Sequence, residues 1–323
     1  MSFRRLVRPN VNLRSLTTSS SRDYSRKAIR LSLPDLEFST PKKTVNFCDK
    51  CPGPDIETPY TRVFPPEHED AIDYKKSMPA AFHLRHLLIS TGDRKWPKAI
   101  EKDQGSLAFE IAEKRHEFPL RSKMAKGGIL VSNTTLPSVE GHEEGNGEKS
   151  GSGSAESAKS SESVSNGSTE SSDSSITTSS AYLFPDNLVI KNIPHNQTEE
   201  FLETLLEEND EIRAIKLKEK FGAVDNSSDL WLVCGHSERD VRCGDIGPLI
   251  LAEMDEIKPE GTQTGLISHI GGHAFAGNVL LFSGKTGQSA WFGRVRPEHI
   301  QGLVKEWKDG RIVKELYRGT FAE

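Results

Sequence analysis

The chain has few cysteines and no long apolar segment. Only 4 cysteines occur in 323 residues, too few for the disulfide scaffold of a small secreted protein. No apolar run approaches the roughly 18 residues that would span a bilayer, so we expect no membrane span. Apolar residues make up 34% of the chain and the mean hydropathy is −0.54, low values for a fully globular protein. Part of the chain is therefore expected to be disordered.

The expected disorder is concentrated in residues 139–180. Fifteen of these 42 residues are serine, and none is aromatic. Such a segment cannot bury enough apolar surface to offset the entropy lost on ordering, so it predicts a disordered loop. A solvated tether is the favoured interpretation, with serine phosphorylation as the alternative.

Residues 1–24 have the composition of a mitochondrial presequence. They contain five arginines and many serines and threonines, with no acidic residue before Asp23. The alternative is a basic terminus without a targeting role. Removal of the segment would change the net charge from −5 to −9, because five arginines and one aspartate leave. An acidic mature protein is a poor nucleic-acid binder.

Two cysteines and two histidines form the most informative pattern. Eight residues separate Cys234 from Cys243, three separate His269 from His273, and 25 lie between the pairs. Thiolate with imidazole suits zinc or an iron–sulfur centre and disfavours magnesium and calcium. The cysteine spacing is wider than in a zinc finger, and His236 lies between the cysteines as a competing ligand. The residues predict a metal site and leave zinc and iron–sulfur open, although each alone could be an ordinary core residue.

The local sequence places these residues on predictable elements. The apolar run 229–233 predicts a buried strand that ends at the first cysteine. A helix-periodic segment ending at Met254 puts Cys243 near a helix N-terminus, where the macrodipole favours anionic sulfur. Gly271 and Gly272 predict a loop between the histidines.

Three motifs around these residues resemble the sucrase/ferredoxin-like family. They are Cys-Gly-His-x-x-Arg-Asp-x-Arg-Cys-Gly at 234–244, Ser-His-Ile-Gly-Gly-His-x-x-Ala-Gly-Asn at 268–278, and Trp-Phe-Gly-Arg-Val-Arg-Pro-Glu-His at 291–299. The resemblance covers the chain apart from the leader and the serine-rich segment, and it is closest to a fungal mitochondrial branch. No carboxylate pair suited to glycoside hydrolysis is visible, so the first half of the family name carries no functional expectation.

The resemblance implies an α/β protein with two thioredoxin-like domains. The N-terminal domain, residues 42–215, would be degenerate and interrupted by the disordered serine-rich loop. The C-terminal domain, residues 220–323, would be ferredoxin-like and carry a [2Fe–2S] cluster. The implied cluster ligands are Cys234, Cys243, His269 and His273. Periodicity alone predicts only a mixed α/β chain.

The implied function is one-electron transfer to a mitochondrial redox protein, in the matrix or the intermembrane space. Imidazole ligands are neutral and can titrate, so the potential would exceed that of an all-cysteine ferredoxin and electron transfer would couple to proton transfer. Four arginines are candidates to surround the cluster: Arg239, Arg242, Arg294 and Arg296. Their alternative role is ion pairing with Asp240 and Glu298.

Two other functions remain open. Cys48 and Cys51 form a CxxC pair that could act in a thiol–disulfide oxidoreductase, although no apolar strand precedes it as in a thioredoxin motif. A zinc-stabilised interaction module is the second alternative. No nucleotide fingerprint or flavin motif is visible, so an electron carrier is favoured over an autonomous enzyme. His83 and His86 are expected to face the core and its edge.

Further elements are expected along the chain. The apolar pattern predicts strands over 82–90, 127–132, 183–190, 278–282 and 312–316. It predicts helices over 98–114, 198–208 and 298–308.

Overall fold

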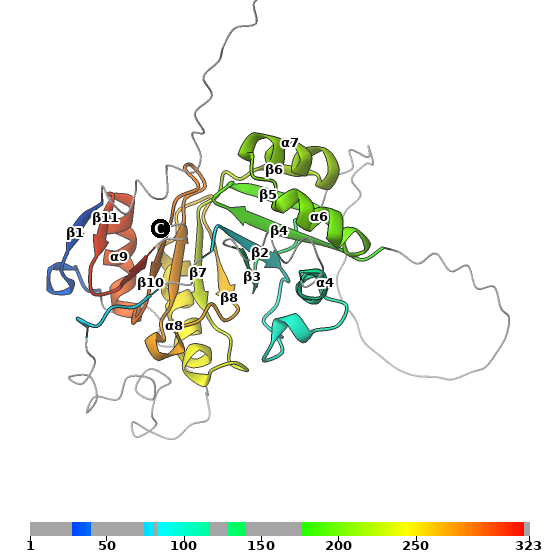
Figure 1. The fold of residues 1–323 in the computed structure, drawn as a ribbon. Helices are drawn as coiled ribbons and strands as arrows, with labels where there is room; N and C mark the ends of the chain where they lie inside the picture. The colour runs from blue at the N-terminus through cyan, green and yellow to red at the C-terminus, as the bar shows by residue number, and fades with distance from the viewer. Residues whose placement is uncertain (1–27, 40–73, 80–82, 116–127, 140–175, 320–323) are drawn as a thin grey trace, which may run out of the picture.

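The computed structural model describes residues 28–39, 74–79, 83–115, 128–139 and 176–319. Within these residues, ten strands form one mixed sheet and two further strands form a parallel pair (Figure 1). The ten strands, in spatial order, are β12 (Tyr317–Gly319), β10 (Ser289–Phe292), β9 (Val279–Phe282), β7 (Leu230–Cys234), β8 (Gln263–Ile267), β3 (Ile129–Thr134), β2 (Arg85–Ser90), β4 (Thr178–Phe184), β5 (Leu188–Pro194) and β6 (Ala223–Asp225). The separate pair is β1 (Ile29–Leu31) with β11 (Arg311–Val313).

The helices lie between and after these strands. The α-helices are α4 (Leu107–Lys114), α6 (Thr198–Leu205), α7 (Asp210–Phe221), α8 (Val241–Ile257) and α9 (Ile300–Lys308). Short 3-10 turns are η1 (Leu33–Asp35), η2 (Ile100–Lys102), η3 (His195–Gln197), η4 (His273–Phe275) and η5 (Pro297–His299). The mixed α/β class predicted from the sequence is confirmed.

The two halves of the sheet repeat one arrangement. In the N-terminal half, β2 pairs in parallel with β3 and antiparallel with β4, which pairs antiparallel with β5. In the C-terminal half, β7 pairs in parallel with β8 and antiparallel with β9, which pairs antiparallel with β10. The helix between the parallel strands is α4 in the first half and α8 in the second. The halves are joined by one antiparallel pairing, Thr134 with Ile267.

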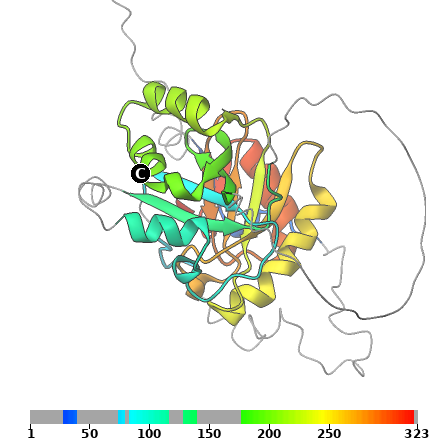
Figure 2. The ribbon, with the colours of Figure 1, turned by 90° about the vertical axis from the view of Figure 1, so that its right-hand side faces the viewer.

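Aromatic side chains pack the two halves of the sheet against each other. The ring centre of Phe184 on β4 lies 4.4 Å from that of Phe282 on β9. The ring centre of Trp291 on β10 lies 5.3 Å from that of His83 and 5.8 Å from that of His86. Helices α4, α6 and α7 lie beside the N-terminal half and helices α8 and α9 beside the C-terminal half (Figures 1 and 2). His83 and His86 were expected at the core and its edge; both are buried in the core, since each is at most 2% exposed.

Local capping sets the helix ends. The Ser106 side chain accepts a hydrogen bond from Phe109 N at the start of α4, and Asp240 accepts one from Arg242 N at the start of α8. Helix α7 ends at Phe221, and the following residue, Gly222, has a φ of 61°, the left-handed conformation common after helices. Such caps supply partners for terminal backbone groups that the helix itself leaves unpaired.

The structure corrects two predicted strands. The strand expected over 183–190 is two strands, β4 and β5, and Asn187 in the turn between them has a φ of 57°. The residues between the two strands are Pro-Asp-Asn at 185–187, a composition typical of turns, and the apolar residues on both sides made the segment look like one strand. The strand expected over 312–316 ends early: β11 stops at Val313, and residues 314–316 form a turn that leads into β12. Helix α7 was not predicted, because its sequence is strongly charged and only weakly periodic.

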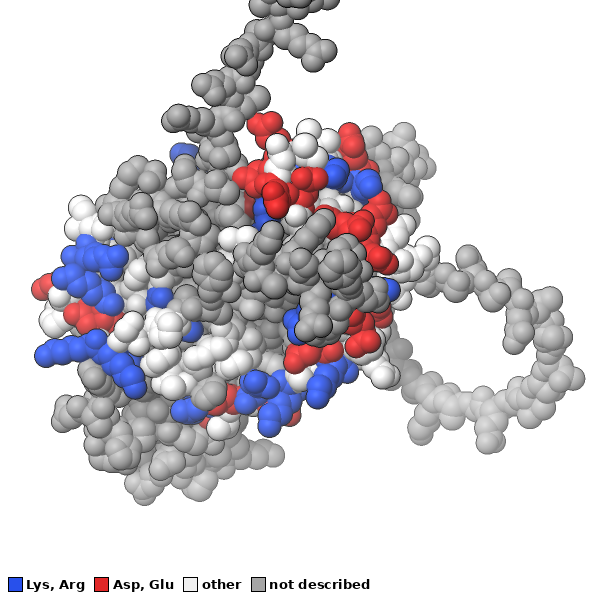
Figure 3. Space-filling model, viewed as in Figure 1, with Lys and Arg blue, Asp and Glu red and all other residues white. Residues whose placement is uncertain are grey.

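Acidic side chains gather over helices α6 and α7 on the face seen in Figure 3. This distribution agrees with the acidic balance of the sequence. None of the described helices is long and apolar enough to cross a membrane. Most of the predicted serine-rich loop lies outside the described residues, but its last residues, from Thr178 onward, belong to β4.

Candidate metal centre

Cys234 is the last residue of β7, a central strand of the C-terminal half. All five residues of β7 are buried, and the strand is flanked by β8 and β9. The backbone amide of Cys234 donates to the carbonyl of Asn278 at 2.9 Å. The cysteine is thereby fixed at the carboxyl edge of the sheet, with its side chain fully buried.

Cys243 is the third residue of α8 and is also fully buried. Two glycines on the same helix allow it to lie this close to the end of β7. A Cβ on Gly244 would lie 2.4 Å from the Cβ of Ser237, and one on Gly247 would lie 2.5 Å from the carbonyl oxygen of Cys234. Any side chain at these positions would push α8 away from the strand, so the glycines bring the two thiols together.

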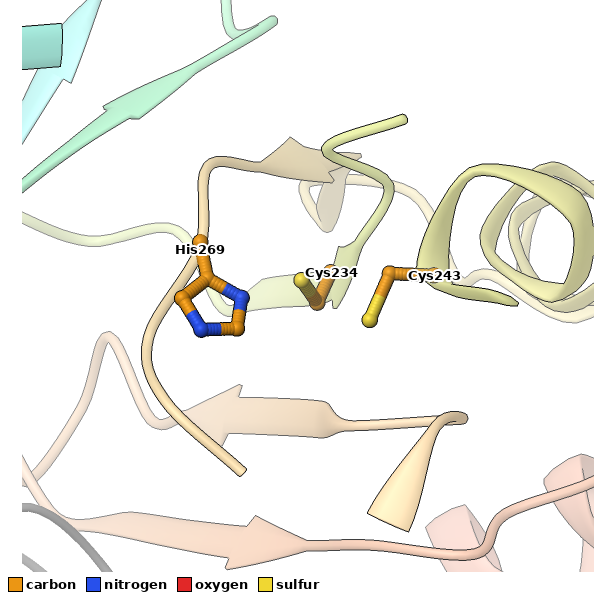
Figure 4. Close-up of side chains that lie close together, drawn as sticks. All are labelled: Cys234, Cys243 and His269. Atoms are coloured by element: carbon orange, nitrogen blue, oxygen red, sulfur yellow. The ribbon is translucent and has the colours of Figure 1, made fainter. Parts of the chain in front are cut away.

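His269 reaches the same edge from β8. Because β8 runs parallel to β7, the residues after both strands emerge on one side of the sheet. Figure 4 shows the side chains of Cys234, Cys243 and His269 close together. Their ligand atoms all lie within 4.8 Å of one another. Among the described residues, this is the one group of three or more His, Cys, Asp or Glu side chains that converges in this way. Both cysteines are free thiols.

His236, the competing ligand in the cysteine loop, has another role. Its Nδ1 accepts a hydrogen bond from the backbone amide of His269 at 3.1 Å, and its Nε2 lies 3.0 Å from the carbonyl oxygen of Pro97. The accepting Nδ1 requires the proton on Nε2, which then donates to Pro97. Both ring nitrogens are thus engaged in holding the histidine loop to residues of the N-terminal half.

The fourth predicted ligand, His273, begins the short turn η4. Gly271 and Gly272 precede it with φ of 81° and 75°, so the predicted glycine loop is confirmed. The position of the His273 side chain lies outside what the structure describes. The CxxC pair, Cys48 and Cys51, also lies outside the described residues.

The pKa values of the two buried thiols are shifted in opposite directions. The pKa of Cys234 is held well below its usual value, first by a hydrogen bond from Cys243 and also by hydrogen bonds from His269 and the backbone of His236. The pKa of Cys243 is raised, first by that same hydrogen bond and then by burial. Of the two sulfurs, Cys234 is therefore the one that is more easily deprotonated.

Arg318 on β12 is part of the site, and sequence reasoning missed it. Its Nη1 donates to Asn278 Oδ1 at 2.6 Å and to the carbonyl of Gly271 at 3.3 Å. Its guanidinium also lies 5.8 Å from the ring centre of Phe275 and 5.7 Å from that of Trp291. Burial lowers its pKa to about 10, against the opposing effect of the two cysteines. A buried cation thus lies beside the thiols and braces the histidine loop.

The four arginines proposed from the sequence take different positions. Arg242 pairs with Asp240, with two nitrogen–oxygen contacts of 2.9 Å, and Arg296 pairs with Glu298. Arg294 is buried, with its guanidinium 5.1 Å from the ring centre of Phe275. Arg239 is exposed. The ion pairs foreseen as the alternative role are therefore present for two of the four.

The donor set fits a thiophilic metal. Buried thiols with an imidazole suit zinc or an iron–sulfur centre, whereas magnesium and calcium require oxygen ligands. The carboxyl edge of a sheet, closed by a helix N-terminus, also favours the anionic sulfur that such a metal needs. A mixed α/β sheet with this site defines a candidate thiolate–imidazole metalloprotein.

The comparison with known sequences identifies the family. The chain belongs to the sucrase/ferredoxin-like family, whose sequence model matches residues 77–319. It is 32% identical over 282 residues to Altered inheritance of mitochondria protein 32 of Debaryomyces hansenii, covering 78% of this chain and 88% of the relative. The identity to the protein of that name from Clavispora lusitaniae is 31% over 310 residues, covering 84% and 95%.

A shorter match, over one part of the chain, has a higher sequence identity. The Altered inheritance of mitochondria protein 32 of Saccharomyces cerevisiae is 46% identical over 100 residues, which are 28% of this chain and 32% of the relative. No solved structure matches the chain. The chain is a mitochondrial protein, as the names of these relatives indicate, and the predicted location is confirmed.

Proposed function

We propose that this chain is a mitochondrial electron-transfer protein that binds a [2Fe–2S] cluster through Cys234, Cys243, His269 and His273. The observation that carries the proposal is the convergence of two buried thiols and one imidazole within 4.8 Å. When bound, the cluster would supply a one-electron redox centre, with a potential raised by its imidazole ligands relative to all-cysteine ferredoxins.

The surrounding residues prepare the site for such a group. The hydrogen bonds that lower the pKa of Cys234 keep one sulfur ready as a thiolate ligand. Arg318 provides a buried positive charge beside sulfurs that become anionic on binding metal. His236 holds the backbone amide of His269, which orients the histidine loop toward the thiols.

The proposal extends to the domain organisation. In each half, the central strand has a parallel neighbour on one side and an antiparallel neighbour on the other, and a further antiparallel strand pairs with the latter. A helix connects the two parallel strands, as in thioredoxin. We assign residues 42–215 and 220–323 to two thioredoxin-like domains and residues 1–24 to a cleaved presequence. The electron partner would be another mitochondrial redox protein, in the matrix or the intermembrane space.

Anaerobic purification followed by visible and EPR spectroscopy tests the cluster. We expect a coloured protein with equal amounts of iron and acid-labile sulfide, and an EPR signal that appears on reduction. Cys234→Ser and Cys243→Ser should lose the cluster because an alkoxide replaces thiolate poorly. His269→Cys should keep it, with a lower potential and a weaker pH dependence, because a thiolate adds negative charge and does not titrate like an imidazole.

The CxxC supplies a matched control. A variant with serine at both Cys48 and Cys51 removes the same number of thiols and should keep full colour, because the proposal gives these residues no part in the cluster. Colourless, iron-free protein containing stoichiometric zinc would establish a zinc module instead and overturn the proposal.

A further inference from the structure

The repeated arrangement of strands places a second site in the N-terminal half. In the C-terminal half, the candidate metal ligands lie where the parallel strands β7 and β8 end and α8 begins. The corresponding place in the N-terminal half is where β2 and β3 end and α4 begins. Crevices outside the carboxyl ends of strands are the usual ligand sites of open α/β sheets.

A cavity of about 300 Å³ lies at this place. Its lining includes Ser90 at the end of β2, Asn133 near the end of β3, and Leu107 and Ala108 at the start of α4. Cysteine is absent from the lining, so the cavity is not a second thiolate site. Its volume suits a small metabolite.

The interior offers polar groups that have no partner among the described residues. Ser90 Oγ and Asn133 Oδ1 are buried without a hydrogen bond, and these residues are only 7% and 2% exposed. Buried polar atoms are normally paired, so a ligand is the natural partner. The Asn133 side chain can present its donor instead of its acceptor by rotation of the amide, and the Ser90 hydroxyl can donate.

The first turn of α4 adds a positive potential. Phe109 N donates to the Ser106 side chain and Glu110 N to the Ser106 carbonyl. The amides of Leu107 and Ala108 have no hydrogen-bond acceptor among the described residues. Free amides at a helix N-terminus, together with the macrodipole, favour an anionic group.

A neutral histidine joins two walls of the cavity. His195 Nε2 lies 2.8 Å from Ser179 Oγ on β4, and the ring also hydrogen-bonds to the backbone of Gly105 before α4. Burial lowers the pKa of His195, which keeps the ring uncharged. The charged lining residues Asp93, Lys95 and Asp103 are exposed, so they lie toward the mouth and leave the interior uncharged.

The geometry points to a binding site for the carboxylate or phosphate of a small metabolite, with the anionic group between the first turn of α4, Ser90 and Asn133. The site is independent of the metal. It lies beside the candidate centre, however, because Asn133 N donates to Ser268 Oγ and Ser268 N to the carbonyl of Asn133, immediately before His269.

Trp96 provides the readout for a binding test. This side chain lines the cavity, is 3% exposed, and donates from Nε1 to Thr91 Oγ1. The full chain would be titrated with sodium succinate, L-glutamate and inorganic phosphate, with calorimetry and tryptophan fluorescence followed in parallel. We expect at least one probe to bind saturably, with a fluorescence change that is lost in Trp96→Phe. The probe that binds distinguishes a carboxylate site from a phosphate site.

Two variants test where the anion binds. Asn133→Asp places a negative charge in the cavity and should weaken binding at least about tenfold, as expected for losing a hydrogen bond to a charged group and gaining repulsion. Ser90→Ala, which changes little volume, should weaken it several-fold. Asn192→Asp adds the same charge at an exposed position of β5 and should bind like the unaltered chain. Absence of saturable binding by all three probes, or full affinity in Asn133→Asp, would overturn the proposal.

Discussion

Replacing Arg318 by methionine should destabilise the protein and impair its metal site together. The guanidinium donates to Asn278 Oδ1, to the carbonyl of Gly271 and, at 2.8 Å from Nη2, to the carbonyl of Pro79. Methionine has similar length but no donor. A buried acceptor that loses its partner costs about 1–3 kcal/mol, and removal of one charged partner from a buried polar network costs about 3–5 kcal/mol. We therefore expect a loss of about 4 kcal/mol, a fall in Tm of roughly 10 °C for a domain of this size.

The same substitution removes the buried positive charge beside the thiols. Cys234 and Cys243 act electrostatically on Arg318, so the guanidinium in turn stabilises their anionic forms. Metal binding requires these sulfurs to be deprotonated. We expect the purified Arg318→Met protein to retain less metal than the unaltered chain, measured as metal per chain by elemental analysis beside the thermal unfolding curve.

Two further variants separate charge from geometry. Arg318→Lys keeps the charge but loses the planar fork, so it should lose stability yet retain more metal than Arg318→Met. Arg242→Met removes an exposed arginine near the same centre, and its pair with Asp240 should be worth at most about 1 kcal/mol. Unchanged Tm and metal content in Arg318→Met would refute the bracing role. Equal metal loss in the lysine and methionine variants would refute the electrostatic part.

Two other predictions concern stability and packing. Burial lowers the pKa of His299 from 6.5 to about 4, and its Nδ1 accepts a hydrogen bond from Arg296 N. Between pH 7 and pH 5 this histidine becomes protonated in the unfolded chain but stays neutral in the folded chain. The free energy of unfolding should therefore fall by about 2 kcal/mol over this range because of this residue. His299→Gln, compared by urea unfolding at the two pH values, should show a smaller fall; an identical one would exclude this role. Gly247→Ala should displace α8, because its Cβ would lie 2.5 Å from the carbonyl oxygen of Cys234. Metal content and Tm should both drop, and an alanine variant with full metal content would show that α8 can shift without disturbing the site.

Local sequence was sufficient where the relevant contacts are local. The apolar run before Cys234 predicted β7, and the periodicity ending at Met254 predicted a helix with Cys243 near its N-terminus, which is α8. The paired glycines predicted the loop before His273. In each case the signal depends on residues within one strand, one helix turn or one loop, where side-chain period and backbone freedom decide the structure.

The sequence by itself determined the chemistry of the candidate centre: thiols and imidazoles, their spacing, and the elements that carry them. Tertiary structure decided which groups meet. It brought Arg318 to the histidine loop, engaged both nitrogens of His236, and joined β1 to β11 across most of the chain. It also placed the cavity of the N-terminal half beside the centre through Asn133 and Ser268. Contacts between residues so distant in sequence depend on how sheets and helices pack, and the periodicity within one element does not predict that packing.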